Sequence, residues 1–172
     1  NVAEGYRKIK DKADTFKRIW DEAGITSQEF SYSPITVRKR YGRDNEPESN
    51  IVEQKICIIS RDIDKVEKLA AGDAKLMDNN VAFESSDIEF HCSDLQDAKK
   101  ELLKKAMINA RERADEIISA TGNTVDKLKS ASSGVFQITE PFNVNVSDYG
   151  MYDTTSRKKN IKVTVRANFI IK

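Results

Sequence analysis

Apolar residues recur at three- and four-residue steps between residues 93 and 122, a pattern that predicts one long helix. The repeating positions are Leu95, Ala98, Leu102, Ala106, Ala110, Ala114 and Ile117. Ser93 and Gln96 have the spacing of a capping box, and Gly122 supplies a residue that tolerates positive φ at the other end. Alanine fills the middle of this stripe, where a coiled coil would carry leucine or isoleucine. We therefore expect the helix to lie flat on a sheet.

Similar patterns divide the rest of the chain into further helices and strands. Helical spacing predicts helices at residues 2–22 and 61–77, the second weakened or broken at Gly72, and it places Trp20 in the core. Apolar runs and alternation predict strands at residues 30–41, 51–60, 81–83, 88–92, 128–138 (interrupted by small residues at 130–134) and 161–171. This order indicates an α+β fold, in which a mostly antiparallel sheet packs against a long helix in the C-terminal half and two shorter helices.

Length and charge narrow the class of protein. The 172 residues suffice for one domain with a sizeable core, so we expect a single domain over residues 1–172. A hydrophobic content of 38% with 33% charged residues is typical of a soluble globular protein. The net charge of +1 disfavours a protein that coats nucleic acid, and no nucleic-acid partner is expected. No apolar run reaches the ~18 residues of a membrane span.

The cysteines and the single histidine do not form a metal pattern. Cys57 and Cys92 each lie in an apolar, strand-like run, so we expect buried thiols, while a disulfide between them stays open. His91 and Cys92 are neighbours in a predicted strand and point to opposite faces, so they cannot hold one ion together. We expect His91 beside Glu89 on a solvated face, and no metal or cofactor.

Catalytic signatures are missing from the sequence as well. It contains neither a phosphate-binding glycine loop nor a GxSxG nucleophile motif. The sequence therefore predicts that the protein is not an enzyme and has no catalytic or cofactor-binding residues. A hydrolase or redox enzyme that uses a carboxylate pair, or Cys57 or Cys92, remains the alternative.

A basic run begins at Arg38 and ends at Arg43, at the tip of a predicted hairpin. It consists of Arg38, Lys39, Arg40, Tyr41 and Arg43, followed by the acidic residues Asp44, Glu46 and Glu48. Such a run can contact nucleic acid or anionic lipid, or it can protect an exposed strand from pairing with other molecules. The acidic residues cancel most of the field, which favours protection of the strand.

A long connection at residues 141–159 is the best candidate for an interaction surface. Connections of this length in a compact domain are uncommon and often functional. Tyr149, Met151 and Tyr152 surround Gly150 and are residue types enriched at interfaces, so we predict a partner or subunit contact there. Ordinary packing onto the protein's own surface is the alternative.

Several segments together resemble one protein family. These are AKKELLKKAMINARERADEIISATG in the long helix, then VDKLKSASSGVFQITEP and VSDYGMYDTTS, followed by the closing amphipathic strand. They resemble the SIMPL-domain family, which includes the YggE-like and periplasmic immunogenic proteins of the bacterial envelope. The resemblance implies an α+β fold, an extracytoplasmic location, assembly into oligomers and a suggested link to envelope and oxidative stress. It assigns no catalytic residues.

Members of that family carry an N-terminal signal or membrane anchor and one or two strands before the first helix. This chain starts at the helix with Asn1, so we expect a SIMPL-like domain that lacks its anchor and first strand or strands, with membrane attachment only through that anchor. The first hypothesis is a non-enzymatic envelope protein that acts by forming a homo-oligomer or binding a protein partner. The alternatives are the enzyme described above and a nucleic-acid-binding module that uses Arg38 to Arg43.

Overall fold

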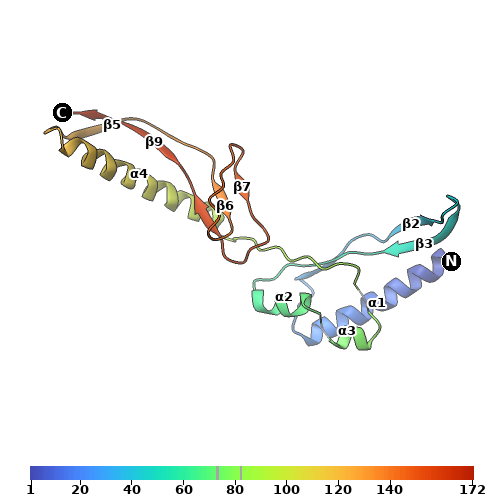
Figure 1. Cartoon of the computed structure of the whole chain (residues 1–172). Coiled ribbons are helices and arrows are strands. Elements are labelled where there is room, and N and C mark those ends of the chain that lie inside the picture. The colour runs from blue at the N-terminus through green and yellow to red at the C-terminus, as the bar shows by residue number, and fades with distance from the viewer. Residues whose placement is uncertain (73, 82) are drawn as a thin grey trace. The chain divides into compact units, whose positions relative to one another are not determined.

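The computed structural model describes residues 1–72, 74–81 and 83–172 (Figure 1). Its helices and mostly antiparallel strands confirm the α+β class, and the strands form four small sheets. The chain divides into two compact units, Asn1–Ile88 and Glu89–Lys172, called here the N-terminal and C-terminal units. The expected single domain over residues 1–172 stays a prediction. Residue 73 of the predicted helix 61–77 and residue 82 of the predicted strand 81–83 lie outside the described residues.

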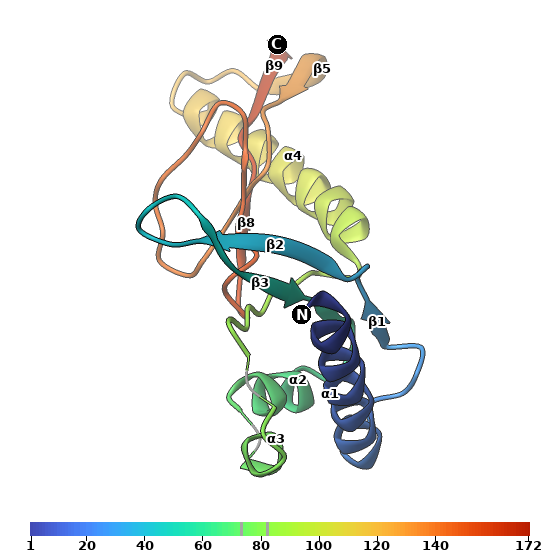
Figure 2. The same cartoon turned by 90° about the vertical axis from the view of Figure 1, so that its right-hand side faces the viewer.

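The N-terminal unit combines one long helix with two antiparallel strand pairs. Its elements are α1 (Val2–Glu22), β1 (Phe30–Tyr32), β2 (Thr36–Tyr41), β3 (Pro47–Glu53), β4 (Ile56–Ile58), α2 (Ile63–Ala70) and α3 (Ala74–Asp78). Helix α1 has the predicted bounds, and its N-terminal part lies against the end of β3 in the β2–β3 hairpin (Figure 2). The predicted helix 61–77 is split, and Gly72, with φ +97°, lies between its two parts.

The core of this unit lies where α1 meets α2 and α3. It contains Phe16, Ile19, Trp20, Ile25, Leu69, Leu76 and Val81. Trp20 is therefore a core residue, as predicted. The nearly continuous apolar run Ile56–Ile59 is typical of a strand covered on both faces, but only the face with Ile56 and Ile58 packs against the core. Cys57 and Ile59 are exposed as a result.

The C-terminal unit is built around the predicted long helix. Its elements are α4 (Leu95–Ser119), β5 (Val125–Ser133), β6 (Gln137–Thr139), β7 (Met151–Tyr152), β8 (Asn160–Lys162) and β9 (Val165–Ile171). Helix α4 lies along the antiparallel β5–β9 pair, which confirms the helix-on-sheet prediction (Figure 1). The predicted capping box is wrong: α4 begins after Asp94 and has no side-chain cap hydrogen bond. Gly122 has φ +75° beyond the other end, as expected.

The strands of this unit differ from prediction because their partners decide where pairing stops. The small residues 130–133 were expected to interrupt a strand, yet they continue β5, where Ala131 lies opposite Ala167 of β9. The break comes at residues 134–136 instead. The predicted strand 161–171 is divided into β8 and β9, and residues 88–92 are not in a strand. Strand β6 pairs with β8 antiparallel and with β7 parallel.

Candidate interaction surface

The connection between β6 and β7 displays a series of large apolar side chains to solvent. Phe142 is 96% exposed, Val144 83%, Val146 76% and Tyr149 98%. Together with Tyr152 of β7, 47% exposed, these residues are called here the loop surface. Single exposed apolar residues are ordinary, but a contiguous group of them indicates an interaction site or an aggregation liability.

A buried glutamine holds the middle of this connection in place. Gln137 of β6 is 7% exposed, and its Nε2 donates to the carbonyl of Ser147 at 2.7 Å. The backbone N–H of Ser147 donates in return to Oε1 of Gln137 at 3.3 Å. The side-chain amide of Gln137 thus makes the same two hydrogen bonds that a backbone residue in a strand would make. It fixes Ser147, ten positions away along the chain.

The segment before Ser147 turns Asn143 toward the protein and the apolar residues around it toward solvent. The carbonyl of Asn143 accepts from Nζ of Lys162, and its Oδ1 accepts from the N–H of Asn145 at 2.7 Å. Its Nδ2 donates to Oε1 of Glu140 at 2.9 Å. Phe142 has φ +67°, a conformation that bulky residues rarely adopt. The fold therefore holds a strained phenylalanine in water.

Asp153 orders the far end of the connection. Its Oδ1 accepts from both the N–H and the Oγ1 of Thr155 at 2.8 Å, and Nζ of Lys159 lies 3.6 Å from its Oδ2. The Thr155 hydroxyl, with further help from Ser156 and Lys159, holds the pKa of this carboxyl well below its usual range. Hydrogen bonds thus fix the loop surface at both ends.

The three predicted interface residues have different surroundings. Tyr149 is among the most exposed side chains, Tyr152 is partly exposed with its ring 6.3 Å from that of His91, and Met151 is half-buried opposite Gln137. Phe142, Val144 and Val146 were not predicted as interface residues from the sequence. Their alternation with asparagine directly after Pro141 was the available signal.

The basic hairpin at Arg38 to Arg43 pairs with its own strands. Nε of Arg38 donates to Oε2 of Glu53 at 3.0 Å, and Nε of Arg40 lies 3.8 Å from Oε2 of Glu48. These pairs join β2 to β3 and neutralise part of the basic charge. This arrangement supports protection of the strand over a nucleic-acid site.

The two thiols are free, and the histidine contacts a neighbouring carboxylate. Cys57 and Cys92 are free and exposed, so the prediction of buried thiols is wrong and there is no disulfide between them. Nε2 of His91 lies 3.0 Å from Oε2 of Glu89, the neighbour that the sequence suggested. Within residues 1–72, 74–81 and 83–172, no group of three or more His, Cys, Asp or Glu residues is placed to hold a metal ion.

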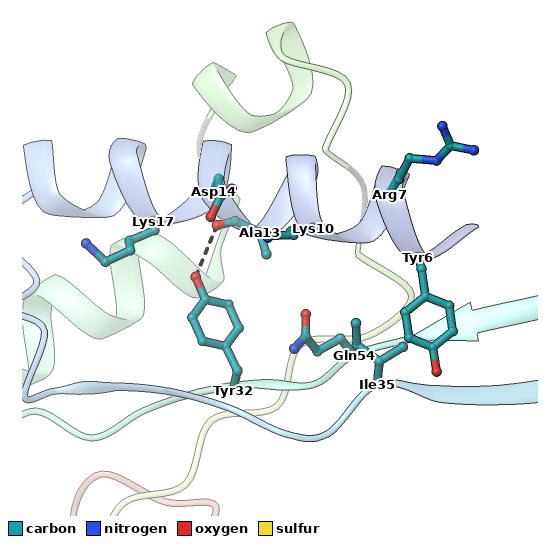
Figure 3. Close-up of a pocket in the computed structure, with 9 residues that line it drawn as sticks. All are labelled: Tyr6, Arg7, Lys10, Ala13, Asp14, Lys17, Tyr32, Ile35 and Gln54. Carbon is teal, nitrogen blue, oxygen red and sulfur yellow. Dashed lines mark hydrogen bonds between the residues drawn. The ribbon is translucent and has the colours of Figure 1, made fainter. Parts of the chain in front are cut away.

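A groove of about 470 Å³ runs along α1 in the N-terminal unit (Figure 3). Tyr6, Ala13, Tyr32 and Ile35 give it an apolar lining. The hydroxyl of Tyr32 donates to the carbonyl of Ala13 at 3.1 Å, as the dashed line in Figure 3 marks, and partial burial raises the pKa of Tyr32. The residues that line the groove include no serine, cysteine or histidine, so they cannot form a Ser–His or Cys–His pair.

Of the helices in the described part of the chain, none combines the length and the apolar character that crossing a membrane requires.

Comparison with known proteins identifies one family. The family model named SIMPL, described as a protein of unknown function (DUF541), matches residues 1–169. This match confirms the resemblance seen in the sequence and spans both units. No curated protein and no solved structure matches the chain.

Proposed function

This chain belongs to the SIMPL family, and we propose that it is a non-enzymatic protein of the cell envelope that acts by self-association through the loop surface. The observation that carries the proposal is the exposure of four large apolar side chains on a connection held by buried Gln137. Burying such a side chain is worth about 1.5–3 kcal/mol, which the free chain forgoes.

The backbone at Phe142 supports the same proposal. A bulky residue with positive φ costs roughly 1–3 kcal/mol, and a 96% exposed ring returns no packing within the chain. Strain of this kind persists at sites that bind something. Aromatic residues at positions 142, 149 and 152 also match the composition of the central part of protein interfaces.

The envelope location and the link to stress rest on the family resemblance. The absence of enzymatic activity is proposed because the groove on α1 contains no serine, cysteine or histidine, and the described residues form no metal-binding cluster. Fractionation of the natural full-length protein tests the location, and recovery in the cytoplasm would contradict it.

Multi-angle light scattering over a wide range of protein concentration tests the self-association. We expect oligomers for the unmodified chain, and a lower mass for the double variant Phe142→Ser with Tyr149→Ser. The matched control is Ile59→Ser with Met77→Ser, since both side chains are 77% exposed in the N-terminal unit. A monomer at every concentration, or loop and control variants of equal mass, would refute the proposal.

A further inference from the structure

Helix α4 has no buried residue along its 25 positions. Its apolar stripe, including Leu102 and Ala106, is only half-buried, and Ile108 and Ile117 are 60% and 72% exposed. In the described chain the sheet that lies against this helix has two strands, β5 and β9. Further strands could therefore extend the β5–β9 sheet, and a second helix could pack beside α4.

The edge of β5 that faces away from β9 is long and has no strand paired with it in the described chain. Strand β5 is nine residues long, and in the described chain only β9 pairs with it. Arg111 of α4 donates to the carbonyls of Val125 and Asp126 at 2.9 and 3.0 Å. The carbonyl groups at the start of the strand therefore already have hydrogen-bond partners. The side chains from Lys127 onward are exposed.

The hydrogen-bond pattern identifies which backbone groups face this edge. The N–H of Gly134 donates to the carbonyl of Thr164 at 2.9 Å, so these two residues form a hydrogen-bonded pair. Antiparallel pairs alternate in type, and therefore Ser133 and Ala131 turn their N–H and C=O groups away from β9. The residues around Ala131 are small, and Ser130 to Ser133 carry none of the charged side chains that commonly protect an edge.

We propose that β5 pairs antiparallel with β5 of a second copy, across a two-fold axis near Ala131. This inference rests on the proposed self-association and adds a second contact to it. The product is a continuous four-stranded sheet, in the order β9–β5–β5–β9, with both α4 helices on one face. An isologous contact of this kind needs only one self-complementary patch.

Geometry and charge favour a second copy over another partner. Strands lie about 4.8 Å apart, so the two β5–β9 pairs would be centred about 10 Å apart. That distance matches the ~8–10 Å between packed helix axes, so each α4 would cover the other. With the axis near Ala131, Ser130 faces Ser132, and Lys129 faces Ser133. No two lysines of the edge are then opposite each other.

Cysteine cross-linking of the full chain tests this arrangement. In a Cys57→Ser, Cys92→Ser background, we would oxidise Ser130→Cys alone, Ser132→Cys alone, and the two variants mixed. At least one of the three samples should form dimers ~10-fold faster than Asn168→Cys, because a disulfide needs Cα atoms within about 7 Å. Asn168 is the matched control: it lies opposite Ser130 on β9, and the two copies of it would be about 14 Å apart. Rates no higher than those of the control would overturn the inference.

A second variant separates pairing from folding. Ala131→Pro removes an N–H that faces the edge and leaves the bonds to β9, so it should slow cross-linking of the cysteine variants ~10-fold with an unchanged circular dichroism spectrum. Unchanged cross-linking would count against the proposal.

The same measurements distinguish this inference from the proposed function. Cross-linking that persists in Phe142→Ser with Tyr149→Ser supports the edge contact, whatever happens to the larger oligomer. Oligomers that depend on the loop surface but show no edge cross-linking would overturn the edge contact alone.

Discussion

Phe142 carries two costs that nothing within the chain offsets: a positive φ and near-complete exposure of its ring. Replacing it with asparagine, which tolerates this conformation, should raise the free energy of unfolding by about 1 kcal/mol. Urea unfolding at a concentration where the chain is monomeric measures the change. Val144→Asn is the control, because Val144 is also exposed but does not have positive φ. Equal effects of the two changes would show that Phe142 is not strained.

Glu29 makes the stability of the N-terminal unit depend on pH. Ser60 donates a hydrogen bond to its carboxylate, and Thr26 donates from both N–H and Oγ1 at 2.9 Å, which lowers the pKa of Glu29 to about 2. A lowered pKa adds stability that is fully present above the unfolded value of 4.5 and is lost as the pH falls toward 2. We expect the free energy of unfolding of Glu29→Gln to depend less on pH between pH 5 and pH 2 than that of the unmodified chain. Urea unfolding followed by Trp20 fluorescence at each pH measures it. Glu46→Gln, in the hairpin loop, serves as the control, and an unchanged slope in Glu29→Gln would contradict the assignment.

Cys57 shows how far residue-level prediction from sequence reaches. The apolar run around it correctly predicted a strand, but burial depends on what covers that strand, and the run carries no information about its cover. Because they are free and exposed, both Cys57 and Cys92 should react with a thiol reagent in the folded protein without denaturant. Fewer than two reactive thiols per chain without denaturant would show that one of them is covered, for instance by a second copy.

At the level of elements, periodicity predicted helices well and strand limits poorly. Helix α1 has the predicted ends because its stripe and its stop at Gly24 are local signals. The extent of β5 is set by pairing with β9, and the loop surface by the reach of Gln137 to Ser147. Both are contacts between distant residues. Tyr149 could therefore be predicted from residue type, whereas the hydrogen bonds between Gln137 and Ser147 that hold the connection could not.

The core of the N-terminal unit and the apolar stripe of α4 should differ in how much their packing contributes to stability. Leu76 of α3 is 1% exposed in the core that α1 completes, and Leu76→Ala should cost about 2–5 kcal/mol. Leu102 of α4 is half-buried, so Leu102→Ala in the monomer should cost only about 1 kcal/mol. Denaturant unfolding of both variants at low concentration gives the comparison. Equal losses would mean that α4 is covered as completely as the N-terminal core.

At the scale of the whole molecule, the two units differ in how much they bury. Among the residues that the structure describes, seven apolar ones form the core of the N-terminal unit, whereas the buried apolar residues of the C-terminal unit are Val125 and Ile138. A small core gives a low stability, which association can raise by mass action. The stability of the C-terminal unit should therefore depend more strongly on protein concentration than that of the N-terminal unit.

Unfolding followed with two probes tests this difference. Trp20, the single tryptophan, reports on the N-terminal unit, and a fluorophore on Ser119→Cys in the Cys57→Ser, Cys92→Ser background reports on α4. At low concentration α4 should unfold at lower denaturant than Trp20. Raising the concentration should move the α4 transition upward and leave that of Trp20 in place, because association stabilises only the unit that makes the contact. Transitions that coincide at every concentration would instead favour one cooperative domain over residues 1–172.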